Sequence, residues 1–88
     1  MAKTLRVEVT AEDIAEGARS DRHECPLAKA GQRQGLLNPA VGLYWYQCGP
    51  IDGRERYELS ERAARFIEDS DNGHPVKPTT FVFRRAAA

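Results

Sequence analysis

Four side chains of the types that bind zinc are spread along this chain of 88 residues: His23, Cys25, Cys48 and His74. Structural zinc sites usually draw their ligands in closely spaced pairs, such as Cys-x-x-Cys. Here a single residue separates His23 from Cys25, and the other two ligand types stand alone in the sequence. The spacing therefore predicts no metal site, and we expect two reduced thiols and two surface histidines.

Cys25 is the strongest candidate for a nucleophile, because the next residue, Pro26, suits the first turn of a helix. Amides at a helix N-terminus favour a thiolate and would lower the thiol pKa somewhat. We also expect Cys25 to be accessible, because it caps the helix after a polar loop. A catalytic cysteine also needs a base, an orienting group and an oxyanion site, and the sequence marks none of these. It also has no Walker loop, dinucleotide fingerprint or paired-carboxylate motif. We therefore expect a non-enzymatic protein with no cofactor.

Aromatic and arginine side chains gather in the second half of the chain, at Tyr44, Trp45, Tyr46, Arg56, Arg84 and Arg85. On a sheet, such side chains can clamp single-stranded nucleic acid. They are also enriched at the centres of protein–protein interfaces. Because 13 basic residues balance 13 acidic ones, the chain lacks the positive charge typical of nucleic-acid-binding domains. A protein interface is therefore favoured, and a nucleic-acid or nucleotide site stays as the alternative.

Hydrophobic periodicity and turn residues predict the elements that position these side chains. Thr10 and Asp13 have the spacing of a capping box, and Ser60 can cap another helix. The expected elements are a strand over 5–10, helices over 11–18 and 26–35, strands over 40–48 and 56–59, a helix after residue 60, and a strand over 79–84. This β-α-α-β-β-α-β order predicts an α+β fold of two layers, a four-stranded, largely antiparallel sheet with helices packed on one face.

The hairpin between the second and third predicted strands decides which side chains share a face of the sheet. A two-residue turn at Asp52-Gly53 pairs Cys48 with Tyr57. The predicted core face then carries Tyr44, Tyr46, Cys48, Tyr57 and Leu59.

The opposite face carries the charged side chains of Arg56 and Glu58, which mark it as exposed to solvent. Large apolar side chains on such a face indicate a contact surface. The predicted interface consists of Val41, Leu43, Trp45, Arg56 and Arg84. Its partner is another protein or a second copy of the chain.

Length and hydropathy limit the class of protein. A chain of 88 residues suffices for one domain with a thin core, expected over 1–85 with a frayed tail over 86–88. No segment has the ~20 apolar residues of a transmembrane helix, and residues 1–6 contain no apolar run typical of a signal peptide. We therefore expect a cytoplasmic protein that does not bind membranes.

Two stretches of the chain carry a resemblance to a known group of proteins. The first contains Val7-Glu8-Val9-Thr10-Ala11-Glu12-Asp13-Ile14, Gly17 and Cys25-Pro26-Leu27-Ala28, and the second contains Leu59-Ser60, Ala63, Phe66, Gly73, Val76-Lys77-Pro78 and Phe81. Together they resemble small uncharacterised proteins of tailed bacteriophages and of their actinobacterial or proteobacterial hosts. The resemblance implies a phage accessory protein that acts in the bacterial cytoplasm. Such a protein would bind a host protein, for example a defence complex such as a CRISPR effector.

Overall fold

Five strands and three helices lie in residues 4–18 and 21–86, which are the part of the chain that the structure, a computed structural model, describes. In chain order they are β1 (Thr4–Val9), α1 (Ala11–Glu16), α2 (Pro26–Arg33), β2 (Ala40–Val41), β3 (Trp45–Cys48), β4 (Glu55–Glu58), α3 (Glu61–Asp71) and β5 (Thr79–Arg85). The predicted α+β class is confirmed. Within these residues no helix is both long and apolar enough to cross a membrane.

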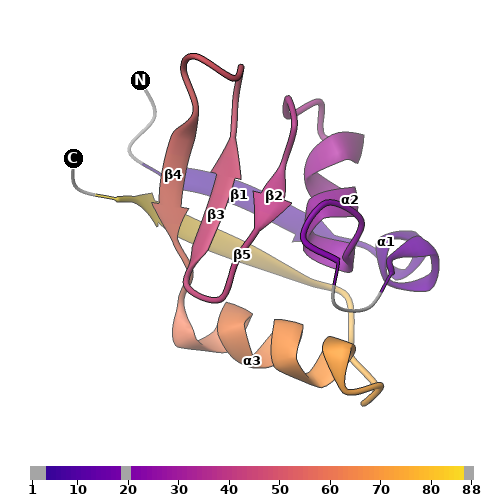
Figure 1. Cartoon of the computed structure of the whole chain (residues 1–88). Coiled ribbons are helices and arrows are strands. Elements are labelled where there is room, and N and C mark those ends of the chain that lie inside the picture. The colour runs from indigo at the N-terminus through magenta and orange to yellow at the C-terminus, as the bar shows by residue number, and fades with distance from the viewer. Residues whose placement is uncertain (1–3, 19–20, 87–88) are drawn as a thin grey trace.

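The strands form one antiparallel sheet in the order β1-β5-β4-β3-β2, which curls around the core (Figure 1). The prediction of four strands was wrong, because the apolar run over 40–48 folds back on itself as the β2–β3 hairpin. Gly42 lies at this reversal, and its amide donates a hydrogen bond of 2.8 Å to the carbonyl of Trp45. At the other end of the chain, β5 includes Arg85, and Ala86 donates to the carbonyl of Arg56. Of the expected tail, residues 87–88 lie outside the described part.

Side-chain caps set the starts of α1 and α3. In α1 the capping box is complete, because the Thr10 hydroxyl accepts from the Asp13 amide at 3.3 Å and the Asp13 carboxylate accepts from the Thr10 amide at 2.8 Å. Helix α3 begins after Ser60, whose hydroxyl accepts from the amide of Ala63. Pro26 occupies the first turn of α2, as predicted.

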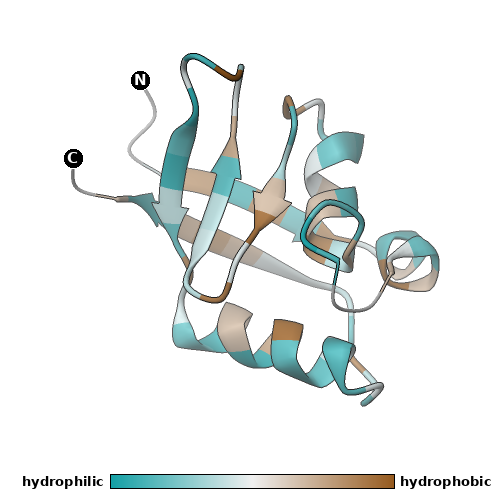
Figure 2. Cartoon of the chain, in the orientation of Figure 1, coloured by the Kyte–Doolittle hydropathy of each residue, from teal (hydrophilic) through white to brown (hydrophobic). Residues whose placement is uncertain are grey.

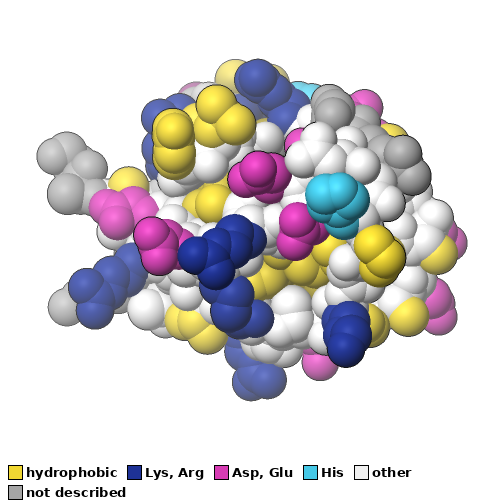
Figure 3. Space-filling model, turned by 90° about the horizontal axis from the view of Figure 1, so that it is seen from below, with side chains coloured by type: hydrophobic (Ala, Val, Ile, Leu, Met, Phe, Trp, Pro, Cys, Tyr) yellow, Lys and Arg dark blue, Asp and Glu magenta, His cyan; other side chains and the backbone are white. Residues whose placement is uncertain are grey.

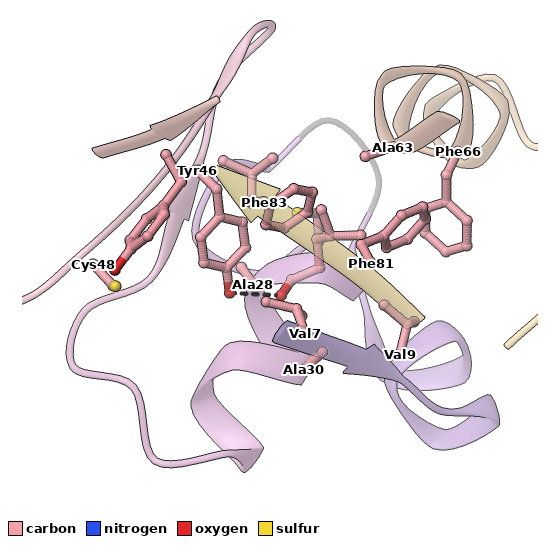
Figure 4. Packing of buried hydrophobic residues seen from close by; sticks show 14 residues of the cluster. Val7, Val9, Ala28, Ala30, Tyr46, Cys48, Ala63, Phe66, Phe81 and Phe83 are labelled. Carbon is pink, nitrogen blue, oxygen red and sulfur yellow. Dashed lines mark hydrogen bonds between the residues drawn. The ribbon is translucent and has the colours of Figure 1, made fainter. Parts of the chain in front are cut away.

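The core lies between the inner face of the sheet and the helices. Four aromatic rings run through it in contact: Phe66 meets Phe81 edge-on, Phe81 stacks on Phe83, and Phe83 stacks on Tyr46, with ring centres 5.4, 5.9 and 5.4 Å apart (Figure 4). Helix α2 contacts both edge strands, β1 and β2, and so closes the open side of the curled sheet. Buried side chains of α2 and α3 join the same apolar cluster as those of the sheet. The predicted packing of helices on one face is consistent with this arrangement.

The β3–β4 hairpin has a longer loop than the predicted Asp52-Gly53 turn. Cys48 pairs with Glu55, and Tyr46 with Tyr57, so the register is two residues away from the prediction. Gly49 follows the last residue of β3 and turns the chain into this loop with a φ of 115°, a conformation that glycine adopts without strain. A shift of two residues keeps every side chain on its face. Tyr46, Cys48 and Tyr57 are therefore buried together, as expected.

Candidate interaction surface

The tip of the β2–β3 hairpin presents two large apolar side chains to solvent. Leu43 is 78% exposed and Tyr44 is 79% exposed. Their turn is held by the bond from Gly42 to Trp45 and by a second bond of 3.1 Å from the Leu59 amide to the Tyr44 carbonyl. The turn is one of the brown, hydrophobic segments of Figure 2 and lies beside the start of α3. The backbone thus displays this apolar pair in a fixed position.

Trp45 supports the tip from the outer face of the sheet. Its side chain is half-buried and lies against Gly42, where a Cβ atom would overlap the indole ring. The guanidinium groups of Arg56 and Arg22 lie over the ring, 4.9 and 5.9 Å from its centre. Each contact has the geometry of a cation–π interaction. Trp45 is therefore less available to a partner than the sequence predicted, while the two arginines form a basic border next to the tip.

The structure brings together only part of the predicted interface. Leu43, Trp45 and Arg56 lie on or beside the hairpin tip, and Arg56 also donates to the side chain of Gln47 at 3.1 Å. Val41, expected on the exposed face, is 6% exposed and belongs to the core cluster. The prediction treated 40–48 as one strand, in which side chains alternate between the two faces. The chain reverses direction between Val41 and Trp45, so that alternation does not continue from β3 into β2. Arg84 is exposed on β5 and is separated from Trp45 by Glu58.

Tyr44 is the residue of this surface that the sequence analysis missed. It was assigned to the core face beside Tyr46, yet it lies at the tip of the turn. Gly42 was the available signal, because a glycine inside an apolar run often marks a break in the strand.

The outer face of the sheet mixes positive and negative charge. Arg84 lies opposite Glu58 on the neighbouring strand, and Glu58 lies opposite Trp45. Arg85 lies on the opposite, core-side face, since it pairs with buried Tyr57, and there it is 4.0 Å from the carboxylate of Glu55. On the outer face, Glu58 therefore interrupts the continuous row of arginines that a nucleic-acid site would need.

Both cysteines are buried free thiols. Burial raises the pKa of the Cys25 thiol, and this outweighs the opposite effect of the Ala28 and Leu27 amides at the start of α2. The expectation of an accessible Cys25 with a lowered pKa was wrong, because the core covers the end of the helix. Burial also raises the pKa of Cys48. Within the described ranges, no three His, Cys, Asp or Glu side chains lie close enough to hold a metal ion.

Side chains and a loop cover the two edges of the sheet. At β1, the Gln34 amide group accepts from the Glu8 amide at 2.6 Å and donates to the Arg6 carbonyl at 2.9 Å. Arg33 donates to the Glu8 carbonyl at 2.6 Å, and it also pairs with the buried carboxylate of Asp13 at 3.3 Å. At β2, the Val41 amide donates to a loop carbonyl. These contacts occupy groups that would otherwise pair with an added strand.

No protein-family model, curated protein or solved structure matches the chain.

Proposed function

We propose that this domain is a non-enzymatic protein-binding module that docks through the hairpin tip formed by Leu43 and Tyr44. The observation that supports it is the exposure of both side chains, 78% and 79%, on a turn whose backbone is held by two hydrogen bonds. Burying large apolar side chains against a partner gains free energy. Because the turn is already ordered, little conformational entropy is lost when it binds.

The surroundings of the tip favour a protein partner. Tyrosine and arginine are enriched at the centres of protein interfaces, and Tyr44 lies next to the basic border of Arg22 and Arg56. Docking by side chains also agrees with the covered edges of β1 and β2, which leave little room for an added strand. A nucleic-acid site is the weaker candidate, because an acidic side chain interrupts the positive charge on the outer face of the sheet.

The biological setting in this proposal comes from the resemblance to phage accessory proteins. The domain acts in the bacterial cytoplasm and binds a host protein. A defence complex such as a CRISPR effector is the example that the resemblance suggests, and a second copy of the chain is the alternative partner.

The experiment is a quantitative affinity purification from host cells that express the tagged chain. The test variant is Leu43→Ser with Tyr44→Ser. The matched control is Leu37→Ser with Ile51→Ser, because these side chains are also exposed, at 55% and 85%, but lie away from the tip. Circular dichroism checks that both variants remain folded.

We expect one host protein to be enriched by the wild-type chain and by the control variant, and to be lost with the tip variant. The purified pair should then bind directly with the same pattern. Equal recovery with both variants would contradict the proposal. Recovery of nucleic acid in place of protein would favour the alternative function.

A further inference from the structure

An open groove with an apolar floor lies between α3 and the segment that leads into β5. Its volume is about 320 Å³, and its floor is formed by Phe66, Val76 and Phe81. Figure 3 views this side of the molecule and shows a recessed yellow area bordered by dark-blue side chains and, along its upper side, by magenta ones. This volume is at the lower end of the range for ligand pockets, and the open shape suits one or two side chains of a bound segment.

Positive charge dominates the rim of the groove. Arg62, Arg65 and Lys77 line it, against a single carboxylate, that of Asp69. Asp69 already lies 3.5 Å from the ring nitrogen of His74. The chain as a whole has no net charge, so this excess of positive charge is a local property of the groove.

The three cations of the rim differ in how they are held. Arg62 donates to the side chain of Thr79 and to the carbonyl of Thr80, and its guanidinium lies 4.4 Å from the centre of the Phe81 ring. It is therefore fixed and completes the wall of the groove. Arg65 and Lys77 form no ion pair with any other described residue. These two cations are available to a bound anion.

We propose that this groove binds an acidic protein segment that carries a large apolar side chain. The apolar side chain packs on Pro75 and Val76, which are the exposed and the half-buried apolar side chains of the lining, and flanking carboxylates pair with Arg65 and Lys77. Nucleic acid fits less well, because Phe66 and Phe81 are 8% and 1% exposed and offer no free ring on which a base could stack. The inference rests on the proposed function, since it names the chemistry of a partner segment. The residues of the groove are separate from those of the hairpin tip, so binding at the groove and docking through the tip can be tested independently.

The test is a titration of the ¹⁵N-labelled protein followed by chemical shifts. The probe is a capped hexapeptide with Leu-Phe at its centre and two acidic residues on each side. A peptide with basic flanks and a peptide with Gly-Ser at the centre serve as comparisons. We expect saturable shifts at the amides of Phe66, Val76 and Lys77 with the first peptide and much weaker shifts with the other two.

Charge reversal supplies the matched variants. Arg65→Glu with Lys77→Glu should weaken binding of the acidic peptide on the order of tenfold or more. The control is Arg54→Glu with Arg84→Glu, which changes the net charge by the same amount but at exposed positions outside the groove. It should leave binding of the acidic peptide unchanged. The tip variant Leu43→Ser with Tyr44→Ser should also bind the peptide normally, even if the tip proves to have no partner.

The inference would be overturned by the absence of saturable shifts, by equal binding of the acidic and basic peptides, or by equal weakening by the two charge reversals. Tighter binding of single-stranded oligonucleotide or of anionic lipid vesicles at the same amides would also overturn it, because the groove would then serve another class of ligand.

Discussion

The hydroxyl of Tyr46 occupies the space that a side chain on Gly31 would need. Tyr46 is fully buried on β3, and its hydroxyl donates a hydrogen bond of 3.0 Å to the carbonyl of Leu27 in α2 (Figure 4). A Cβ atom on Gly31 would overlap that hydroxyl. Glycine inside a helix is normally unfavourable, so this contact explains why α2 has one at position 31.

A side chain at position 31 should therefore destabilise the protein strongly only while the hydroxyl of Tyr46 is present. Gly31→Ala should lower the free energy of unfolding by about 1–3 kcal/mol through overpacking. Tyr46→Phe should lower it by about 1 kcal/mol through the lost hydrogen bond. In the Tyr46→Phe background, Gly31→Ala should lower the free energy of unfolding much less, because the hydroxyl oxygen that overlaps the new Cβ atom is absent. Urea unfolding of all four proteins measures this coupling, and additive losses would disprove it.

The side chain of Gln34 should prevent the edge of β1 from pairing with other chains. Gln34→Ala removes its bonds to Glu8 and Arg6 and exposes two backbone groups of an edge strand. We expect a loss of about 1–2 kcal/mol in stability and concentration-dependent self-association, measured by light scattering. Gln32→Ala is the control, because Gln32 bonds to the His23 carbonyl and not to β1. A monomeric Gln34→Ala protein would contradict this role.

Phe66 should be essential to the packing of α3. It is 8% exposed and meets Phe81 edge-on. Phe66→Ala should lower the free energy of unfolding by about 3–5 kcal/mol, which approaches the total stability of a small domain. Ile67→Ala, at a half-buried neighbour, should cost less. A loss below about 1 kcal/mol for Phe66→Ala would place the ring outside the energetic core.

Stability should fall at alkaline pH. Burial raises the pKa of the Cys25 and Cys48 thiols above the ordinary 9.0, and burial with the hydrogen bond to Glu55 raises the pKa of Tyr57 to about 12. The folded state thus favours the neutral forms. The stability that these neutral groups contribute is complete below the pKa values of the unfolded chain, and it is lost as the pH rises above about 9 towards the folded pKa of Tyr57, about 12.

The urea midpoint should therefore be lower at pH 10.5 than at pH 8. The decrease should be smaller when both cysteines are replaced by alanine, because two of the titrating groups are then absent. A midpoint that does not change over this range would contradict the assignment of these groups as buried.

Local signals in the sequence predicted much of the fold. The capping box of Thr10 and Asp13, the cap at Ser60 and Pro26 in the first turn of α2 all act over a few residues, and all are present. Alternation along a strand likewise placed Tyr46 and Tyr57 on one buried face.

Contacts between distant segments could not be predicted in the same way. Gln34 lies 26 residues from Glu8, and no periodicity links the two. The burial of Cys25 depends on the packing of the whole core around the start of α2. The hairpin at Gly42 was missed because a continuous apolar run favours one long strand. That single error placed Val41 on the surface, although it is buried in the core, and Tyr44 in the core, although it is exposed at the tip.

Site-specific photocrosslinking at Tyr44 tests the proposed function most directly. A photoreactive phenylalanine analogue would replace Tyr44 in one variant and Ile51, another exposed apolar residue in a turn, in a second. After irradiation of host cells, we expect the Tyr44 variant to form an adduct with one protein and the Ile51 variant to form none. No protein adduct at Tyr44, or the same adducts from both positions, would contradict docking through the hairpin tip.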